Sequence, residues 1–200
     1  MYIEVPDASR YADYYVVPYY YIDCEHINHF DNNSLLNLIT LKGFTQLETR
    51  NIEFKVNETN SYPAVYSIFR KTQQIILRRF SFSDSSRRSF IKFLEQSKNN
   101  DENDNVIQDL VKNQEPIIIW GAGQFTLRLL ANSALGKCNI LGFIDSDSNK
   151  QGKKIMNHSI FSPDFLLDKD TSVIICSALH NSDILKIIKK INARTKVYMK

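Results

Sequence analysis

The chain has 200 residues and a formal net charge of +3, and 43% of its residues are apolar, which is sufficient for a globular protein with a hydrophobic core. No apolar run approaches the roughly 18 residues of a membrane span, and acidic and basic residues are interspersed, so neither a membrane span nor a nucleic-acid partner is predicted. Three widely spaced cysteines, with no CxxC pair and no secretory signal, predict reduced thiols in a cytoplasmic protein.

Residues 1–98 predict one α/β segment that ends in an antiparallel hairpin and a helix. A short alternating strand comes first, and a helical pattern then ends at Gly43, where a helix commonly needs a left-handed residue. Asn33 or Ser34 is expected as the N-cap of that helix. Two β-rich runs around the turn-rich "NETNSYP" indicate the hairpin, and a second apolar stripe indicates the last helix. We expect these elements over 1–5, 34–42, 44–54, 64–71 and 84–97.

The second half of the chain is more regular than the first. The polar stretch "QSKNNDENDN" divides the two halves near residue 100. Beyond it, short apolar runs alternate with helical patterns, and this β-α-β-α-β-α-β rhythm predicts a small doubly wound parallel sheet. We therefore expect a first domain over 1–98, a linker with a short helix over 99–114, and a second domain over 115–200.

A glycine turn follows the first buried strand of the second domain. In a doubly wound sheet the ligand lies outside the carboxyl ends of the strands, so the turn "WGAG" and the end of "GFIDSD" are expected to face one crevice. Backbone amides at the start of the next helix can bind a phosphate, and an acidic residue about 20 positions further on can reach a ribose hydroxyl. The predicted ligand-binding residues here are Gly121, Ala122, Gly123, Gln124 and Asp145. The alternative is that the glycines only turn a strand into a helix.

The glycine motif departs from the dinucleotide fingerprint at one position. Thr126 stands where G-x-G-x-x-G has its third glycine, and it adds bulk where helix and strand pack closely. The domain is also short and carries no substrate domain for hydride transfer. A dehydrogenase is therefore not predicted.

The stretch "YIDCEHINHF", residues 21–30, begins at Tyr21, the last of seven tyrosines within the first 21 residues; the chain has ten tyrosines. Glu25, His26 and His29 do not follow the H-E-x-x-H order, and no other cluster supplies further ligands, so no metal is predicted. A carboxylate beside an imidazole can act as a general base if the chain bends there. A partly exposed polar pair without any role is the other interpretation of the residues alone.

Two groups of motifs together resemble the C-terminal part of class I S-adenosylmethionine-dependent sugar C-methyltransferases. The first is "YIEVPDA…EHINHF…LLNLITLKGF", and the second is "IIIWGAGQFTLRLL…ILGFIDSDSNKQGKKI…IFSPDFLL…VIICSA". The resemblance covers nearly the whole chain. It implies a partial methyltransferase-like α/β segment with an antiparallel hairpin, followed by a small Rossmann-like domain that binds a nucleotide-sugar.

The resemblance also implies roles for individual residues. His26 would be the base that removes a proton next to a keto group, Glu25 would assist it, and S-adenosylmethionine would supply the methyl group. The family often has a tyrosine two residues before the glutamate, whereas this chain has Asp23 there and Tyr21 two positions earlier; Tyr21 is the candidate for contact with the substrate.

The family's glycine-rich S-adenosylmethionine loop and its cysteine-rich zinc region are absent from this sequence. On this hypothesis the chain is a C-terminal portion or subunit, inactive unless a partner chain supplies the missing half. The alternative is a non-catalytic nucleotide or nucleotide-sugar binding protein that keeps the fold. A third interpretation is an interaction module that dimerises through its tyrosine-rich edge.

Overall fold

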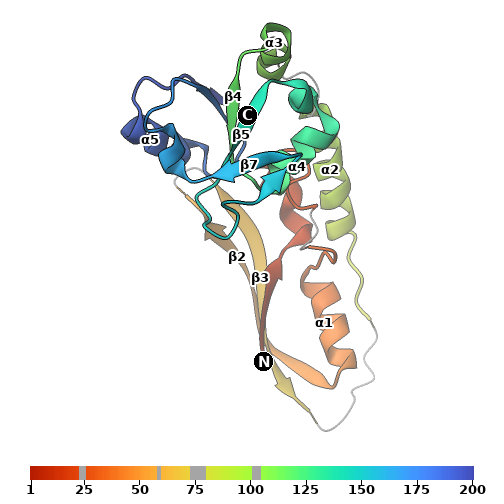
Figure 1. Cartoon of the computed structure of the whole chain (residues 1–200). Helices are drawn as coiled ribbons and strands as arrows, with labels where there is room; N and C mark the ends of the chain where they lie inside the picture. The colour runs from red at the N-terminus through yellow and green to blue at the C-terminus, as the bar shows by residue number, and fades with distance from the viewer. Residues whose placement is uncertain (23–25, 58–59, 73–79, 101–104) are drawn as a thin grey trace. The chain divides into compact units, whose positions relative to one another are not determined.

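The chain divides into two compact units, Met1–Glu102 and Asn103–Lys200, in the computed structural model (Figure 1). Each unit has its own sheet and its own buried core. The α/β class expected from the sequence is confirmed, with an antiparallel sheet in the first unit and a mostly parallel sheet in the second. The structure describes residues 1–22, 26–57, 60–72, 80–100 and 105–200.

The first unit is built on a three-stranded sheet in the order β1-β3-β2, in which both pairs of neighbours are antiparallel. The central strand is β3, and its alternation buries Val65, Ser67 and Phe69. A register shift between Gln46 and Glu48 interrupts the long hairpin of β2 and β3. The predicted hairpin is confirmed. The strands are β1 Tyr2–Pro6, β2 Phe44–Lys55 and β3 Ser61–Lys71.

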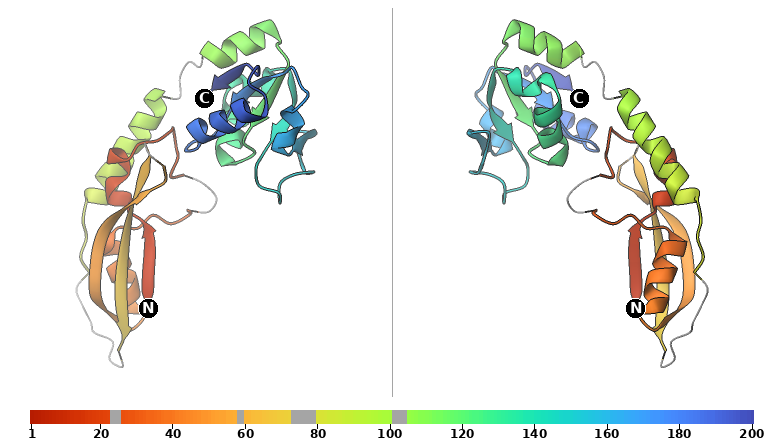
Figure 2. Two further views of the ribbon diagram at one scale, coloured as in Figure 1. Left: turned by 90° about the vertical axis from the view of Figure 1, so that its left-hand side faces the viewer. Right: turned by 90° about the vertical axis from the view of Figure 1, so that its right-hand side faces the viewer.

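The described residues of this unit form three helices: the 3-10 helix η1 over Ala8–Asp13, α1 over Asn32–Leu41 and α2 over Ser85–Asn100. The N-cap of α1 is Asp31, whose carboxylate accepts from the Ser34 amide at 2.7 Å, so the expected cap at Asn33 or Ser34 is wrong. Gly43 follows the helix with φ +81°, as predicted. Figure 2 shows α1 along the strands and η1 beside α2.

The tyrosine-rich run of the first unit forms part of a core. The rings of Tyr11 and Tyr21 stack with centroids 3.9 Å apart, and the ring of Phe93 from α2 meets Tyr21 edge-on at 5.2 Å. All three side chains are almost completely buried. Tyr11 and Tyr21 therefore pack inside the unit, whereas Tyr2 is 57% exposed.

The second unit is a six-stranded sheet in the order β6-β7-β5-β4-β8-β9, parallel except at β6. Alternate residues of the central strand β4 enter cores on opposite faces: Ile117 and Ile119 pack with α3 and α4, whereas Ile118 and Trp120 pack with α5. The doubly wound sheet is thus confirmed. Its main elements are α3 Asn105–Asn113, β4 Ile117–Trp120, α4 Gln124–Asn132, β5 Ile140–Ile144, β8 Ser172–Ile175, α5 Asn181–Ile191 and β9 Val197–Met199.

Sequence patterns did not indicate the hairpin formed by β6, Lys154–Ile155, and β7, His158–Phe161. Met156 and Asn157 make its two-residue turn with φ +48° and +69°, and β7 then continues the parallel sheet beside β5. Two short 3-10 helices, η2 over Ala134–Lys137 and η3 over Pro163–Leu166, complete the unit.

Candidate functional site

The glycine turn of the second unit is held by the strands on both sides of β4. The Gly121 amide donates to the Ile144 carbonyl at 2.8 Å, and the Cys176 amide donates to the Trp120 carbonyl at 2.9 Å. Gly121 has φ +113°, and a Cβ built on it would lie 2.5 Å from the carbonyl oxygen of Cys176. No residue other than glycine fits this position without moving backbone. The ends of β4, β5 and β8 therefore meet at the turn.

Thr126 occupies the position of the missing third glycine without disturbing this packing. Its side chain is completely buried, and its hydroxyl donates to the Gly121 carbonyl at 2.6 Å. The same hydroxyl lies 3.1 Å from the carbonyl oxygen of Cys176. The threonine thus ties the first turn of α4 to the glycine turn and to the end of β8.

Gly123 differs from Gly121 because nothing in the described part of the chain requires glycine there. It is the N-cap of α4, its backbone is extended, and a Cβ built on it would meet no atom within 4 Å. Gln124, the next predicted residue, begins α4 and is exposed. Open space thus lies directly beside a helix N-terminus, where partial positive charge favours an anion.

Asp145 lies at the end of β5 and reaches back to the glycine turn. One carboxylate oxygen accepts from the Ala122 amide at 2.9 Å and from the Lys150 ammonium at 3.0 Å, and the other accepts from the Asp147 amide at 2.9 Å. Burial raises the pKa of Asp145, but these three donors outweigh it and leave the pKa below its ordinary value. The structure therefore brings the glycine turn, with Gly121, Ala122 and Gly123, next to the Asp145 carboxylate.

Lys150 and Asn181 belong to the same edge of the sheet, and sequence reasoning missed both. Lys150 makes the ion pair with Asp145, and a basic residue five positions after Asp145 was the only available signal. Asn181 begins α5, just beyond the carboxyl end of β8. In the part of the chain that the structure describes, its buried amide oxygen has no hydrogen-bond partner.

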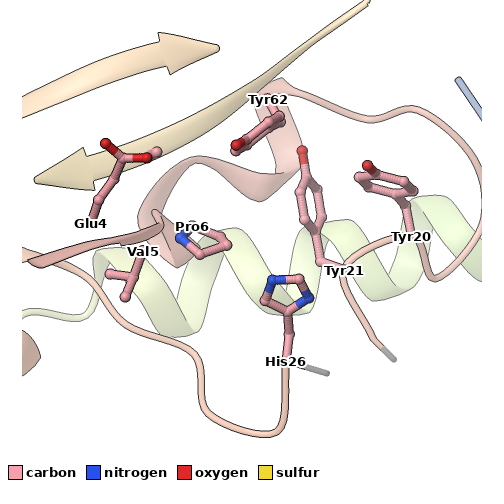
Figure 3. A pocket seen from close by; sticks show the side chains of 8 residues that line it. Glu4, Val5, Pro6, Tyr20, Tyr21, His26 and Tyr62 are labelled. Carbon is pink, nitrogen blue, oxygen red and sulfur yellow. The ribbon is translucent and has the colours of Figure 1, made fainter. Parts of the chain in front are cut away.

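The first unit contains a separate cavity of about 380 Å³. Figure 3 shows Tyr21, Tyr62 and His26 around it, with Glu4 and Tyr20 toward its two ends. Tyr21 and His26, two of the residues singled out from the sequence, therefore line the same cavity. Glu25, the expected partner of His26, lies outside the described residues. The lining consists of Glu4, Val5, Pro6, Tyr20, Tyr21, His26, Tyr62 and Ala64.

His29 is half-buried and packs against the aromatic core of the first unit. Its Nδ1 atom is 3.2 Å from the Tyr11 hydroxyl, and its ring contacts Phe90 with centroids 5.0 Å apart. Within the described ranges, no three His, Cys, Asp or Glu side chains are grouped so that they could hold a metal ion. Those same ranges contain no helix with the length and apolar character that crossing a bilayer requires.

Comparisons with known proteins find one family model that matches the second unit and solved structures that cover about three fifths of the chain. A family model described as C2185-like, N-terminal, matches residues 113–198, which is less than half of the chain. The structure of RSP in complex with β-NADH has 16% sequence identity and a TM-score of 0.35, covering 58% of this chain and 68% of that one. The structure of RSP, a Rex-family repressor, has 11% identity and a TM-score of 0.36, covering 62% and 63%. No curated protein matches.

These findings correct the resemblance to sugar C-methyltransferases, which is wrong. The family model that matches residues 113–198 carries a different description and not that of a methyltransferase. S-adenosylmethionine is accordingly wrong as the expected cofactor, and a partner chain to supply its binding half has no remaining basis. The motifs misled because each has a local structural role: Asp7 caps η1, and Gly43 ends α1.

Proposed function

We propose that the second unit, which contains the expected domain over 115–200, is a non-catalytic binding domain for a nucleotide or nucleotide-sugar. The ligand lies at the carboxyl ends of β4, β5 and β8, where the strand order reverses direction around β4. The observation that carries the proposal is the contrast between the two glycines: Gly121 is required by the fold, whereas Gly123 is required by nothing in the described chain. A ligand that approaches the backbone closely accounts for the second glycine.

The N-terminus of α4 supports a phosphate as the part of the ligand beside Gly123. No side chain of the described structure caps this helix, so the backbone there faces the open space directly. A helix N-terminus favours negative charge because its amides point outward and its dipole is positive at that end. A phosphate group of the ligand binds at this position.

The carboxylate of Asp145 supports a ribose as the next part of the ligand. Two oxygens offer about four acceptor sites, and three donors already occupy three of these sites. The remaining site accepts a hydroxyl hydrogen, and the Lys150 ammonium keeps the carboxylate ionised and oriented for it. Phosphate and ribose together define a nucleotide.

The test is calorimetric titration of the full chain with ADP, NADH and a panel of nucleotide-sugars, compared with the Gly123→Ser variant. Serine preserves helix capping, so the free energy of unfolding stays within about 0.5 kcal/mol. Its side chain enters the open space, so affinity falls roughly tenfold or more, equivalent to about 1.4 kcal/mol. A full-length chain that binds none of these ligands refutes the proposal, as does a Gly123→Ser variant that binds as tightly as the wild type.

A second pair of variants tests the ribose contact. Asp145→Asn removes the charge and the ion pair with Lys150 and weakens nucleotide binding by about tenfold. Asp147→Asn is the matched control, because Asp147 lies in the same loop but its carboxylate accepts from Asn149. Equal losses in the two variants would contradict the role of Asp145.

A further inference from the structure

The cavity of the first unit has walls that are fixed by packing outside it. Tyr11 covers one face of the Tyr21 ring at 3.9 Å, and Phe54 stacks on the Tyr62 ring with centroids 5.1 Å apart. The Tyr21 hydroxyl donates to the Tyr14 carbonyl at 2.7 Å, and this bond anchors the far end of the Tyr21 side chain. Both rings are therefore held by contacts that lie outside the cavity. The cavity is preformed, and its volume of about 380 Å³ lies in the range of small-molecule sites.

Besides the tyrosine rings, the described lining of this cavity carries one carboxylate and one imidazole, those of Glu4 and His26. Among the described residues that line it, Glu4 carries the one carboxylate, and there is no lysine or arginine. The Glu4 charge acts on the lining as well, since burial first and Glu4 second raise the pKa of Tyr62. Arg10 is the nearby cation, but its guanidinium is paired with the buried Asp7 carboxylate at 2.8 Å.

The aromatic rings add a second attraction for positive charge. Tyr20 and Tyr21, neighbours in one loop, and Tyr62 from β3 meet around one space (Figure 3). The face of an aromatic ring carries partial negative charge, and several rings around one space attract a weakly hydrated cation such as a quaternary ammonium group. Strongly hydrated ions gain less, because Val5, Pro6 and Ala64 offer no polar side chain to replace their water.

We propose that this cavity binds a small organic cation, with the Glu4 carboxylate at one end and the rings of Tyr20, Tyr21 and Tyr62 around its ammonium or alkylammonium group. The proposal does not depend on nucleotide binding by the second unit. It also explains why these tyrosines gather around a hollow.

The test uses a charged probe and its uncharged isostere. Choline and 3,3-dimethylbutan-1-ol have the same shape, but only choline carries the positive charge. In calorimetric titrations of the full chain, choline binds and the isostere binds about tenfold more weakly or not at all. Equal binding of the two probes would show that the cavity selects apolar shape alone, and it would overturn the proposal. Binding of glucose without binding of choline would overturn it as well.

Two sets of variants locate the binding. Glu4→Gln removes the charge but keeps an oxygen for the Tyr2 hydroxyl. Because Glu4 is exposed and its charge is screened, the variant weakens choline binding about twofold to fivefold. Glu48→Gln is the matched control, because that carboxylate also accepts from a tyrosine hydroxyl, at 2.8 Å from Tyr66, but does not line the cavity. Tyr20→Phe keeps the ring and the affinity, whereas Tyr20→Leu loses about as much as Glu4→Gln. Unchanged affinity in both Glu4→Gln and Tyr20→Leu would refute the site.

Discussion

The two units form their candidate sites in different ways. In the second unit, one short turn between β4 and α4 supplies most of the groups, and the ends of β5 and β8 fix it in place. In the first unit, the cavity takes its walls from β1, β3 and the loop that follows η1, and α2 supports them from behind. A site made by one local segment leaves a motif in the sequence, whereas a site assembled from distant segments does not.

Among the variants that test this difference between the units, Phe93→Ala is expected to lower the free energy of unfolding the most, and only in the first unit. Phe93 is completely buried, and its ring contacts Tyr11, Tyr15 and Tyr21 behind the cavity. The cavity left by Phe93→Ala lowers the free energy of unfolding of the first unit by about 3 to 5 kcal/mol. Amide hydrogen exchange measures this loss, and we expect faster exchange within residues 1–100 alone. Nucleotide affinity of the second unit stays unchanged, and a parallel loss there would mean that the units are not independent.

Gly121→Ala is expected to have the next largest effect, and it acts on the second unit. The added Cβ would lie 2.5 Å from the Cys176 carbonyl oxygen, at a φ of +113° that alanine rarely adopts. We expect a loss of about 2 to 4 kcal/mol in the free energy of unfolding. Urea denaturation followed by the fluorescence of Trp120, which precedes the turn, measures it. Gly123→Ala is the control, with a loss of about 1 kcal/mol or less; equal losses would contradict the distinction between the two glycines.

Acid pH is expected to have the smallest effect and to act on both units. Burial raises the pKa of Asp31, but bonds from the Ser86 hydroxyl and from Ser34 outweigh it, so the pKa of Asp31, like that of Asp145, lies below its ordinary value of 3.8. A carboxylate whose pKa is lower in the folded state contributes stability above the unfolded pKa. That contribution is therefore complete above about pH 5 and is lost as the pH falls through 3.8 toward the folded value.

The acid effect is measured as the free energy of unfolding between about pH 5 and pH 2.5. Asp31→Asn flattens this dependence for the first unit, and Asp145→Asn flattens it for the second. Asp147→Asn serves as the control, because its carboxylate is exposed. A wild-type protein whose stability rises as the pH falls below 4 would contradict the sign derived for both carboxylates.

Local patterns predicted a large part of the fold and little of its fine detail. Apolar runs and turn residues located the hairpin of β2 and β3 and the strands β4, β5 and β8 because their periodicity reflects burial directly. The strand β7 was missed because His158 and Ser159 are polar, and pairing with β6 and β5 makes a strand of this segment. The N-cap of α1 was misplaced because Asn33, Ser34 and Asp31 are all good caps, and only the observed hydrogen bonds select Asp31.

The sequence by itself determined where the glycine turn lies and that Asp145 follows it at a spacing suited to a nucleotide, because these residues belong to adjacent strand ends in any doubly wound sheet. Only the tertiary structure decided that Gly121 fits against Cys176, that Thr126 replaces a glycine by bonding to the turn, and that Gly123 faces open space. The cavity of the first unit is entirely a tertiary feature. Its tyrosines surround a hollow because Tyr11, Phe54 and Phe93, distant in sequence, support their rings from outside.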